Sequence, residues 1–185
     1  MSDPLESALR RLARVLERAG VPYAFIGGVA VNAWAQPRAT FDLDVLVQAS
    51  AEGEARLARR LRLAGFLPWA PPPQAKVRLP IWSLVFGEGR DRTFIDLFVA
   101  GDEYQFSALS RRRAIPIGGG SIAVLSPEDL LLHKLVAGRT RDMADVESLL
   151  EAMGPKLDRH YLRRWARRLK VALPPGLGAQ KKTLP

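Results

Sequence analysis

Three aspartates lie inside two apolar segments that otherwise have the composition of buried strands. Asp42 and Asp44 alternate with Leu43 and Val45 in "TFDLDVLV", and Asp96 lies in "FIDLFV". Because strand side chains alternate between the two faces of a sheet, Asp42 and Asp44 point the same way. If the two strands are neighbours, the three carboxylates meet on one patch, where they repel one another and each prefers its proton. A bound divalent cation would remove this conflict.

Mg²⁺ is the cation that best suits such a patch, since it takes oxygen ligands and keeps room for waters and substrate phosphates. Two such ions can clamp the attacking and leaving oxygens of an in-line phosphoryl or nucleotidyl displacement. The pattern therefore predicts Mg²⁺ on Asp42, Asp44 and Asp96. The alternative is that these acids lie at strand ends, solvated or paired with Arg38 or Arg92.

A glycine pair, Gly27-Gly28, ends the short apolar segment "PYAFIGG", and thirteen residues separate it from Asp42. Glycines between a strand and a helix let the backbone approach a ligand closely, and the helix N-terminus offers free N–H groups to a phosphate. The pair predicts a phosphate-holding turn, although an ordinary turn has the same composition.

Taken in order, Gly27-Gly28, Asp42-x-Asp44 and Asp96 resemble the DNA polymerase β-type nucleotidyltransferase superfamily. Its minimal pattern is a Gly-Gly or Gly-Ser turn, a spacer, Asp-x-Asp and a third acid. The fuller stretch "PRATFDLDVLV" resembles the AbiEii/MenT-type branch, the toxin-like nucleotidyltransferases of prokaryotic toxin–antitoxin and phage-defence systems. That branch typically has a lysine in its helical half, then an arginine-rich turn and Asp-x-x-Asp. Here "HKLVAGRTRDMAD" supplies Lys134, Arg139, Arg141, Asp142 and Asp145.

The resemblance implies a role for each matching residue. Asp42 and Asp44 would bind the metal ions, and Asp96 would complete the site and accept a proton from the attacking hydroxyl. Gly27 and Gly28 would hold the β- and γ-phosphates of a nucleoside triphosphate.

The same resemblance places further residues around the nucleotide. Arg38, Thr40 and Lys134 would contact it, with Lys134 neutralising phosphate charge. Asp142 or Asp145 would position Lys134 or the acceptor; the alternative is that they pair with Arg139 or Arg141 and serve structure. The superfamily often has serine as the second residue of the turn, so Gly28 removes a hydroxyl and leaves only backbone N–H groups.

The chain of 185 residues carries a net charge of +9, and the excess is unevenly placed. Over residues 156–182, nine Lys or Arg face one acid, Asp158. Such asymmetry predicts a polyanionic partner, with nucleic acid first, although a solubilising surface has the same charge. Trp165, among four arginines, either stacks on a base or is an apolar contact of an amphipathic helix.

Other site classes and locations find little support in the composition. The absence of cysteine excludes disulfides, thiolate metal sites and a cysteine nucleophile. The amphipathic N-terminal segment lacks the apolar core of a signal peptide, and no apolar run reaches membrane-spanning length. We therefore expect a cytoplasmic protein without a membrane partner.

The hydrophobic pattern predicts an α/β (α+β) fold, with a mixed sheet flanked by helices and followed by a small C-terminal helical region. The resemblance implies that the sheet is of the nucleotidyltransferase type. Strands are expected over 22–28, 40–47, 78–87 and 92–100, a hairpin over 115–125, and a proline-rich loop over 68–74. Helices are expected over 3–20, 51–65, 126–138, 141–153 and 158–170, with a brief one at 29–35. We predict a nucleotidyltransferase-like domain over 1–125, a helical region over 126–172 and a flexible tail over 173–185.

These features favour a Mg²⁺-dependent nucleotidyltransferase that moves a nucleoside monophosphate from a triphosphate to an acceptor hydroxyl. The basic C-terminal helix favours RNA, such as a tRNA 3′ end, as acceptor, and the family resemblance adds a toxin role with an antitoxin partner. Two alternatives remain: a non-catalytic module that binds nucleic acid or protein with a vestigial pocket, and a nucleotidyltransferase for small molecules such as antibiotics.

Overall fold

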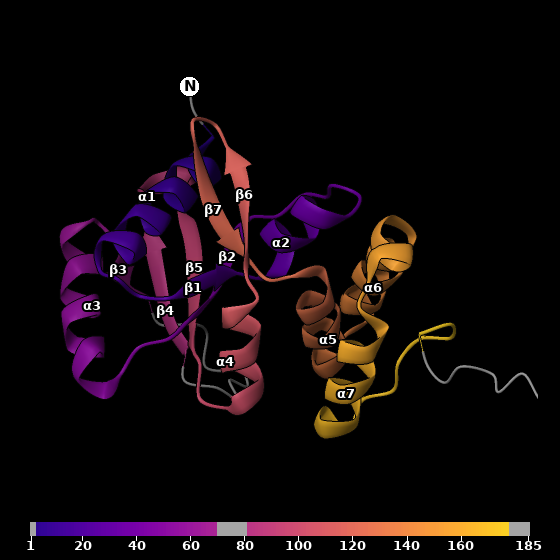
Figure 1. Cartoon of the computed structure of the whole chain (residues 1–185). Coiled ribbons are helices and arrows are strands. Elements are labelled where there is room, and N and C mark those ends of the chain that lie inside the picture. The colour runs from indigo at the N-terminus through magenta and orange to yellow at the C-terminus, as the bar shows by residue number, and fades with distance from the viewer. Residues whose placement is uncertain (1–2, 70–80, 178–185) are drawn as a thin grey trace, which may run out of the picture.

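The computed structural model describes residues 3–69 and 81–177 and shows a seven-stranded mixed sheet with helices on both faces (Figure 1). Only the pairs β5–β2 and β1–β7 are parallel within this sheet. The predicted α/β fold with C-terminal helices is therefore confirmed. In sheet order, the strands are β3 (Leu67–Pro68), β4 (Ile81–Phe86), β5 (Thr93–Val99), β2 (Asp42–Val47), β1 (Tyr23–Phe25), β7 (Gly120–Val124) and β6 (Arg113–Ile117).

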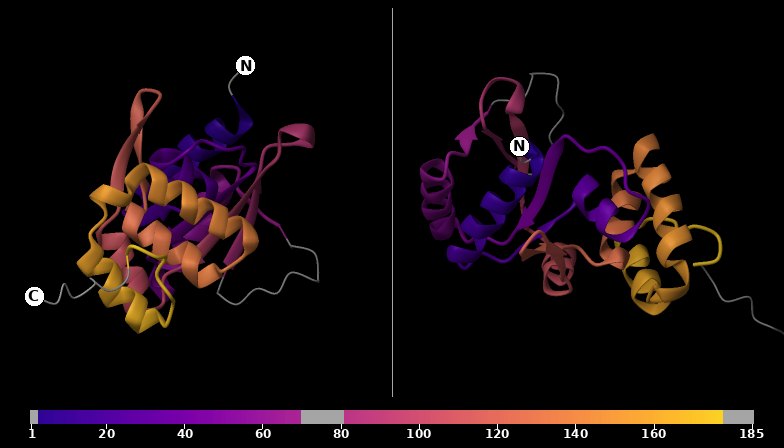
Figure 2. Two further views of the ribbon diagram at one scale, coloured as in Figure 1. Left: turned by 90° about the vertical axis from the view of Figure 1, so that its right-hand side faces the viewer. Right: turned by 90° about the horizontal axis from the view of Figure 1, so that it is seen from above.

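The helices divide between the two sides of the sheet. Figures 1 and 2 show α1 (Pro4–Arg18) and α3 (Ala51–Leu63) on one side, and α2 (Gly27–Trp34) on the other. Beyond α2 lie α5 (Pro127–Ala137), α6 (Thr140–Met153) and α7 (Arg159–Leu169), while α4 (Glu103–Ser110) joins β5 to the hairpin β6–β7. Short 3₁₀ turns occupy Gly89–Asp91 and Gly154–Lys156. None of the helices within the described residues is long and apolar enough to span a bilayer.

Helix α2 connects the sheet to the C-terminal helices. It contacts β2 and β7 on one side and α5 and α6 on the other. It begins at Gly27, two residues before the predicted start of the short helix, so both glycines belong to its first turn. The end of β1, the start of α2 and the start of β2 therefore meet in front of α5 and α6.

Strand β2 separates an apolar face from a polar one. Leu43, Val45 and Val47 are fully buried in the core. Asp42 and Asp44 face the other way, but Leu46, on the same face, is only 2% exposed. The open part of this face is therefore the start of the strand, where the two aspartates lie.

A buried polar cluster fixes α7 against the rest of the fold. Asp129, at the start of α5, is fully buried, and its carboxylate accepts hydrogen bonds from Ser126 Oγ and the Tyr161 hydroxyl, each 2.6 Å long. The Arg111 guanidinium lies 3.9 Å from the centre of the Tyr161 ring. Burial raises the pKa of Asp129, while the hydrogen bonds from Ser126 and Tyr161 oppose the increase.

Trp165 is 4% exposed and packs on Tyr104, with 5.2 Å between ring centroids. It is therefore an apolar contact of α7, and base stacking, its other predicted role, is excluded by burial. Leu173 and Leu177 also pack against the core. The parts of the predicted proline-rich loop after residue 69 and of the predicted tail after residue 177 lie outside the described residues.

The buried cluster yields a prediction about stability. Tyr161→Phe removes the donor to one oxygen of the buried Asp129 carboxylate, which should lower the free energy of unfolding by about 1–3 kcal/mol. Urea denaturation measures this change. Tyr23→Phe is the matched control, because its hydroxyl donates to the exposed Glu17 at 2.9 Å, where water can replace it. Equal losses in both variants would contradict the importance of burial.

Candidate active site

Strands β2 and β5 run parallel and bring the three predicted acids onto one face of the sheet. Their register places Asp44 directly beside Asp96 and Asp42 beside Phe94. The N–H of Ile26, the residue before α2, donates to the Asp44 carbonyl at 2.9 Å. The start of α2 is thereby fixed against the strand that carries Asp42 and Asp44.

Asp42 and Asp96 each accept a hydrogen bond from a neighbouring hydroxyl. Thr40 Oγ1 donates to Asp42 Oδ1 at 3.2 Å, and Ser83 Oγ donates to Asp96 Oδ1 at 2.7 Å. Sequence reasoning missed Ser83. Its signal was a single hydroxyl in the apolar strand "IWSLVF", and the β4–β5 register places it opposite Asp96.

Asp44 is the acid whose environment is least favourable to its charge. Burial, followed by the negative charges of Asp42 and Asp96, raises its pKa to about 6, against the opposing effect of Lys134 and Arg139. None of Asp42, Asp44 and Asp96 forms an ion pair within residues 3–69 and 81–177. An oxygen-rich, un-neutralised group of this kind has the chemistry that a divalent cation requires.

The carboxylates are not gathered into a preformed cage. Over the described parts of the chain, no three His, Cys, Asp or Glu side chains are grouped so as to hold a metal ion as they stand. Asp42 is directed to Thr40 and Asp96 to Ser83, so the hydroxyl contacts occupy part of their oxygen atoms. The oxygen donors and the strand register fit a cation. The side chains of Asp42 and Asp96, however, are directed toward hydroxyl groups and not toward a common point.

The glycine pair is required by the close approach of α2 to β2. Gly27 has φ +57°, in the left-handed region, and a Cβ there would overlap the Asp44 carboxylate. A Cβ at Gly28 would overlap the hydroxyl of Thr40. The first turn of α2 therefore lies directly on the side chains of Asp44 and Thr40, and only glycine permits this contact.

Thr40 thus occupies the space that a serine at position 28 would need. In the superfamily that the sequence resembles, serine often supplies a hydroxyl at the second position of the turn. Here a hydroxyl reaches the same place from the loop before β2, and it also donates to Asp42.

A network of charges joins the C-terminal helices to the loop that carries Arg38, and its cations Lys134 and Arg139 act on Asp44. Lys134 is 4% exposed, and its Nζ lies 2.9 Å from Asp142 Oδ1 and 2.7 Å from Asp145 Oδ2. Arg38 reaches Asp145 through two hydrogen bonds of 2.7 and 2.9 Å, and Arg139 Nε donates to Asp142 at 2.7 Å. Each of the two buried aspartates therefore pairs with two cations.

These pairs decide the charge state of the two helical acids. Burial raises the pKa of Asp142, but hydrogen bonds from Arg139 and Lys134 outweigh it and hold the pKa below its ordinary value. For Asp145, hydrogen bonds from Arg38 and Lys134 do the same. Both acids therefore stay charged and hold Lys134 in place.

The loop between α2 and β2 is held in place from both ends. Asn32 accepts from the Arg38 N–H and donates to the Arg38 carbonyl, both at 2.9 Å. Arg141, which the sequence offered as a partner for Asp142 or Asp145, instead donates to the Ala39 carbonyl at 3.4 Å. Sequence reasoning missed Asn32, whose role depends on a contact between α2 and the loop.

The model of a family described as "Uncharacterised nucleotidyltransferase" matches residues 4–180. A sequence search of curated proteins found no match to the chain.

The fold is similar to several solved structures. One is an antigenic nucleotidyltransferase-like protein from Paracoccidioides brasiliensis, with TM-score 0.57 and 19% identity over 93% of this chain and 94% of that chain. The lincosamide antibiotic adenylyltransferase LnuA, bound to lincomycin, has TM-score 0.55 and 16% identity over 77% of this chain and 94% of its own. The antibiotic-resistance factor ANT(2″)-Ia has TM-score 0.60 and 12% identity over 92% of this chain and 95% of its own. At such identities, the similarities establish a shared fold and not a shared substrate.

The raised pKa of Asp44 predicts that replacing it by a neutral residue stabilises the fold in a pH-dependent way. The pKa of Asp44 is about 6 in the fold against an ordinary value of 3.8, so its ionisation destabilises the fold progressively as pH rises from about 4 to 6. In EDTA, Asp44→Asn should therefore match the wild type near pH 4 and exceed it by about 1–3 kcal/mol above pH 6. Thermal or urea unfolding across this pH range measures the difference. The exposed Asp91→Asn should show no such trend, and a pH-independent effect of Asp44→Asn would contradict the assignment.

The contact between Gly28 and Thr40 predicts a coupled pair of substitutions. Gly28→Ser should destabilise the protein because its side chain meets the Thr40 hydroxyl, and adding Thr40→Ala should recover about 1 kcal/mol of the loss. A double-mutant cycle on thermal unfolding measures this coupling. Gly101→Ser is the control, since a Cβ there meets no atom within 4 Å. Additive effects of the two substitutions would show that Thr40 does not fill the space of a serine at position 28.

Proposed function

We propose that this chain, which belongs to the nucleotidyltransferase family whose model matches residues 4–180, transfers a nucleoside monophosphate from a nucleoside triphosphate to an acceptor hydroxyl, releasing pyrophosphate. The observation that supports the proposal is the register of β2 and β5, which places Asp44 beside Asp96 on the face that also carries Asp42, with Asp44 directly under the first turn of α2. The site lies between the sheet of the proposed domain 1–125 and the proposed helical region 126–172.

Asp42, Asp44 and Asp96 are the residues that would hold Mg²⁺ in this proposal. When bound there, the metal supplies positive charge to the phosphoryl group under transfer and to the attacking oxygen. Asp96 lies beside Asp44 and accepts from Ser83 with one oxygen. Its second oxygen is the group that we assign to taking the proton of the acceptor hydroxyl.

The phosphates of the triphosphate would lie on the first turn of α2. The backbone N–H groups of Gly27 and Gly28 open this helix, and glycine allows a phosphate to approach the backbone as closely as Asp44 and Thr40 do. Thr40 supplies the hydroxyl that Gly28 lacks. Lys134 and Arg38 would add positive charge near the phosphates, and their pairing with Asp142 and Asp145 keeps them in position for binding.

RNA, such as a tRNA 3′ end, is the acceptor that we propose. The charge distribution supports it, since nine Lys or Arg and one acid lie within residues 156–182. The resemblance of "PRATFDLDVLV" to the AbiEii/MenT branch adds the proposal of a toxin role, with an antitoxin as protein partner.

A small-molecule acceptor is the second candidate. It is supported by the similar folds of LnuA, a lincosamide antibiotic adenylyltransferase, and ANT(2″)-Ia, an antibiotic-resistance factor. The two candidates share the same reaction and differ only in the molecule that carries the hydroxyl.

The reaction predicts label transfer that depends on the sheet acids. With α-labelled nucleoside triphosphates, Mg²⁺ and total RNA, the wild type should label RNA, and Asp42→Ala with Asp44→Ala should reduce the rate by at least about a hundredfold. Parallel reactions with lincomycin and tobramycin test the second candidate. Glu52→Ala with Glu54→Ala is the matched control, because it removes two carboxylates from α3, on the other side of the sheet.

Each result of this experiment decides between the functions. Label on an antibiotic and not on RNA would replace the first acceptor by the second. If no acceptor is labelled and Mg²⁺ promotes no nucleotide binding, the chain is a non-catalytic module. Growth arrest on expression, abolished by the same double substitution, tests the toxin role separately.

A further inference from the structure

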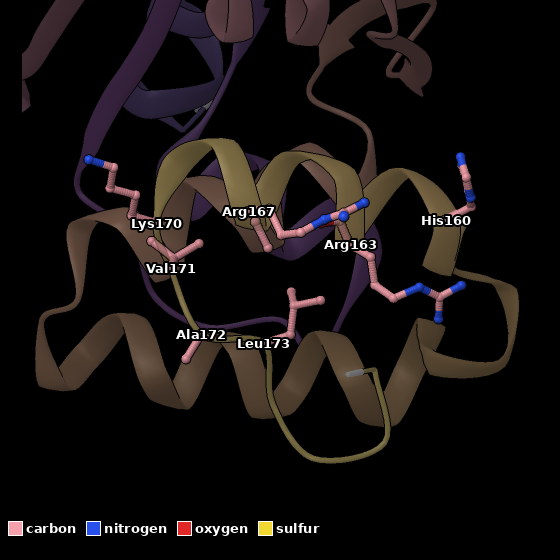
Figure 3. A pocket seen from close by; sticks show the side chains of 8 residues that line it. His160, Arg163, Arg167, Lys170, Val171, Ala172 and Leu173 are labelled. Carbon is pink, nitrogen blue, oxygen red and sulfur yellow. The ribbon is translucent and has the colours of Figure 1, made fainter. Parts of the chain in front are cut away.

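Helix α7 and the segment that follows it enclose a basic groove away from the three carboxylates. The groove has a volume of about 720 Å³ (Figure 3). One wall carries His160, Arg163, Arg167 and Lys170 of α7 and its C-terminal cap, and the segment opposite contributes Val171 and Leu173. Among the residues that the structure describes, no acidic side chain lines it.

The basic side chains of α7 fall into two groups with different partners. Positions 160, 163, 167 and 170 repeat at helical spacing, so they share one face of the helix. Within the described ranges 3–69 and 81–177, none of Arg163, Arg167 and Lys170 forms an ion pair. On another face, Arg164 lies 5.3 Å from the Tyr161 ring centroid, and Arg168 pairs with Glu103 at 2.7 Å.

The charges in the groove are unfavourable to the protein alone. Like charges four residues apart on a helix, such as Arg163 and Arg167, destabilise it. The arginines on the other face are compensated by aromatic rings and by Glu103, whereas those in the groove have no such compensation within the chain described. An anion bound in the groove would supply it.

Lys170 lines the groove at the end of α7 in an unusual backbone conformation. Its φ of +57° makes it the only non-glycine residue with a positive φ among the residues described, in a position where helices usually end with glycine. The turn brings the chain back along α7, and the Val171 N–H donates to the Ala166 carbonyl at 3.0 Å. Glycine would make this turn with less strain. The turn itself therefore does not require lysine, whose side chain adds a positive charge to the lining of the groove.

We propose that this groove binds the phosphate backbone of single-stranded RNA. Its cations follow one another at intervals of about one helical turn, roughly 5 Å, and meet a polyanion along its length. Val171 and Leu173 form an apolar wall against which riboses and bases can pack. RNA is preferred to an acidic peptide because one strand carries both a phosphate backbone and the acceptor hydroxyl. That choice rests on the function proposed above, in which the same strand would continue to the three carboxylates.

A binding experiment on the full chain tests the proposal without requiring catalysis. Fluorescence anisotropy with a labelled single-stranded oligoribonucleotide should show that Arg163→Gln with Arg167→Gln raises the Kd about tenfold at low salt and makes the slope of log K against log salt less steep by about 1.4. Arg164→Gln with Arg168→Gln removes the same charge from another face of the same helix and should change the Kd much less.

Lys170→Gly provides a second variant that does not depend on the arginine pair. It should fold at least as stably as the wild type, because glycine accepts the left-handed conformation, and yet bind the oligoribonucleotide several-fold more weakly. A purely structural role for Lys170 would leave the affinity unchanged.

Three results would overturn the proposal. They are equal losses in the two arginine pairs, unchanged affinity in both groove variants, and tighter binding of an oligoglutamate peptide of the same length. The Asp42→Asn, Asp44→Asn variant separates this proposal from the catalytic one, since it should keep RNA binding. If this variant binds RNA and the wild type transfers no nucleotide, only the catalytic proposal is disproved. If the wild type transfers nucleotide and the groove variants bind RNA normally, only the proposal of RNA binding in the groove is disproved.

Discussion

The mutual repulsion of Asp42, Asp44 and Asp96 is the constraint around which the sheet face is arranged. Parallel pairing of β2 and β5 places Asp44 beside Asp96, and burial with these neighbours raises the pKa of Asp44 to about 6. The fold gives this charge no ion-pair partner within the described residues and places Gly27 directly against it. Because a buried charge without a partner costs stability, this face of the sheet is stabilised less than an apolar one would be.

In the helical region, by contrast, the buried charges are paired with charges of opposite sign. Lys134, Asp142 and Asp145 are buried together, and Arg38 and Arg139 complete their pairing from the loop before β2 and the start of α6. Removing charges from water is costly, and each ion pair here recovers the cost only with its partners in position. The network therefore holds the Arg38 loop, α5 and α6 in one arrangement in front of the acids, and α2 lies between them.

The same distinction between compensated and uncompensated charge recurs on α7. Asp129, Tyr161 and Arg111 anchor one side of this helix in the core, which leaves Arg163 and Arg167 on the groove side. Because one side of α7 is fixed in the core, the side that carries Arg163 and Arg167 has to face outward. The charged wall of the groove is therefore part of a helix that is fixed in the core, while the segment after α7 forms the opposite wall.

The sequence by itself determined the strand alternation that places Asp42 and Asp44 on one face, the ends of most helices and the basic character of α7. These are local features, set by periods of two and 3.6 residues and by capping side chains. Only the tertiary structure decided that Asp96 lies beside Asp44, that Ser83 and Thr40 donate to these acids, and that Asp142 and Asp145 are neutralised by Lys134, Arg38 and Arg139. It also decided that Trp165 is buried, and that Thr40 fills the space beside Gly28. Residue types show which side chains can pair, but the choice among distant partners depends on which helices and strands pack together, and local periodicity carries no record of that packing.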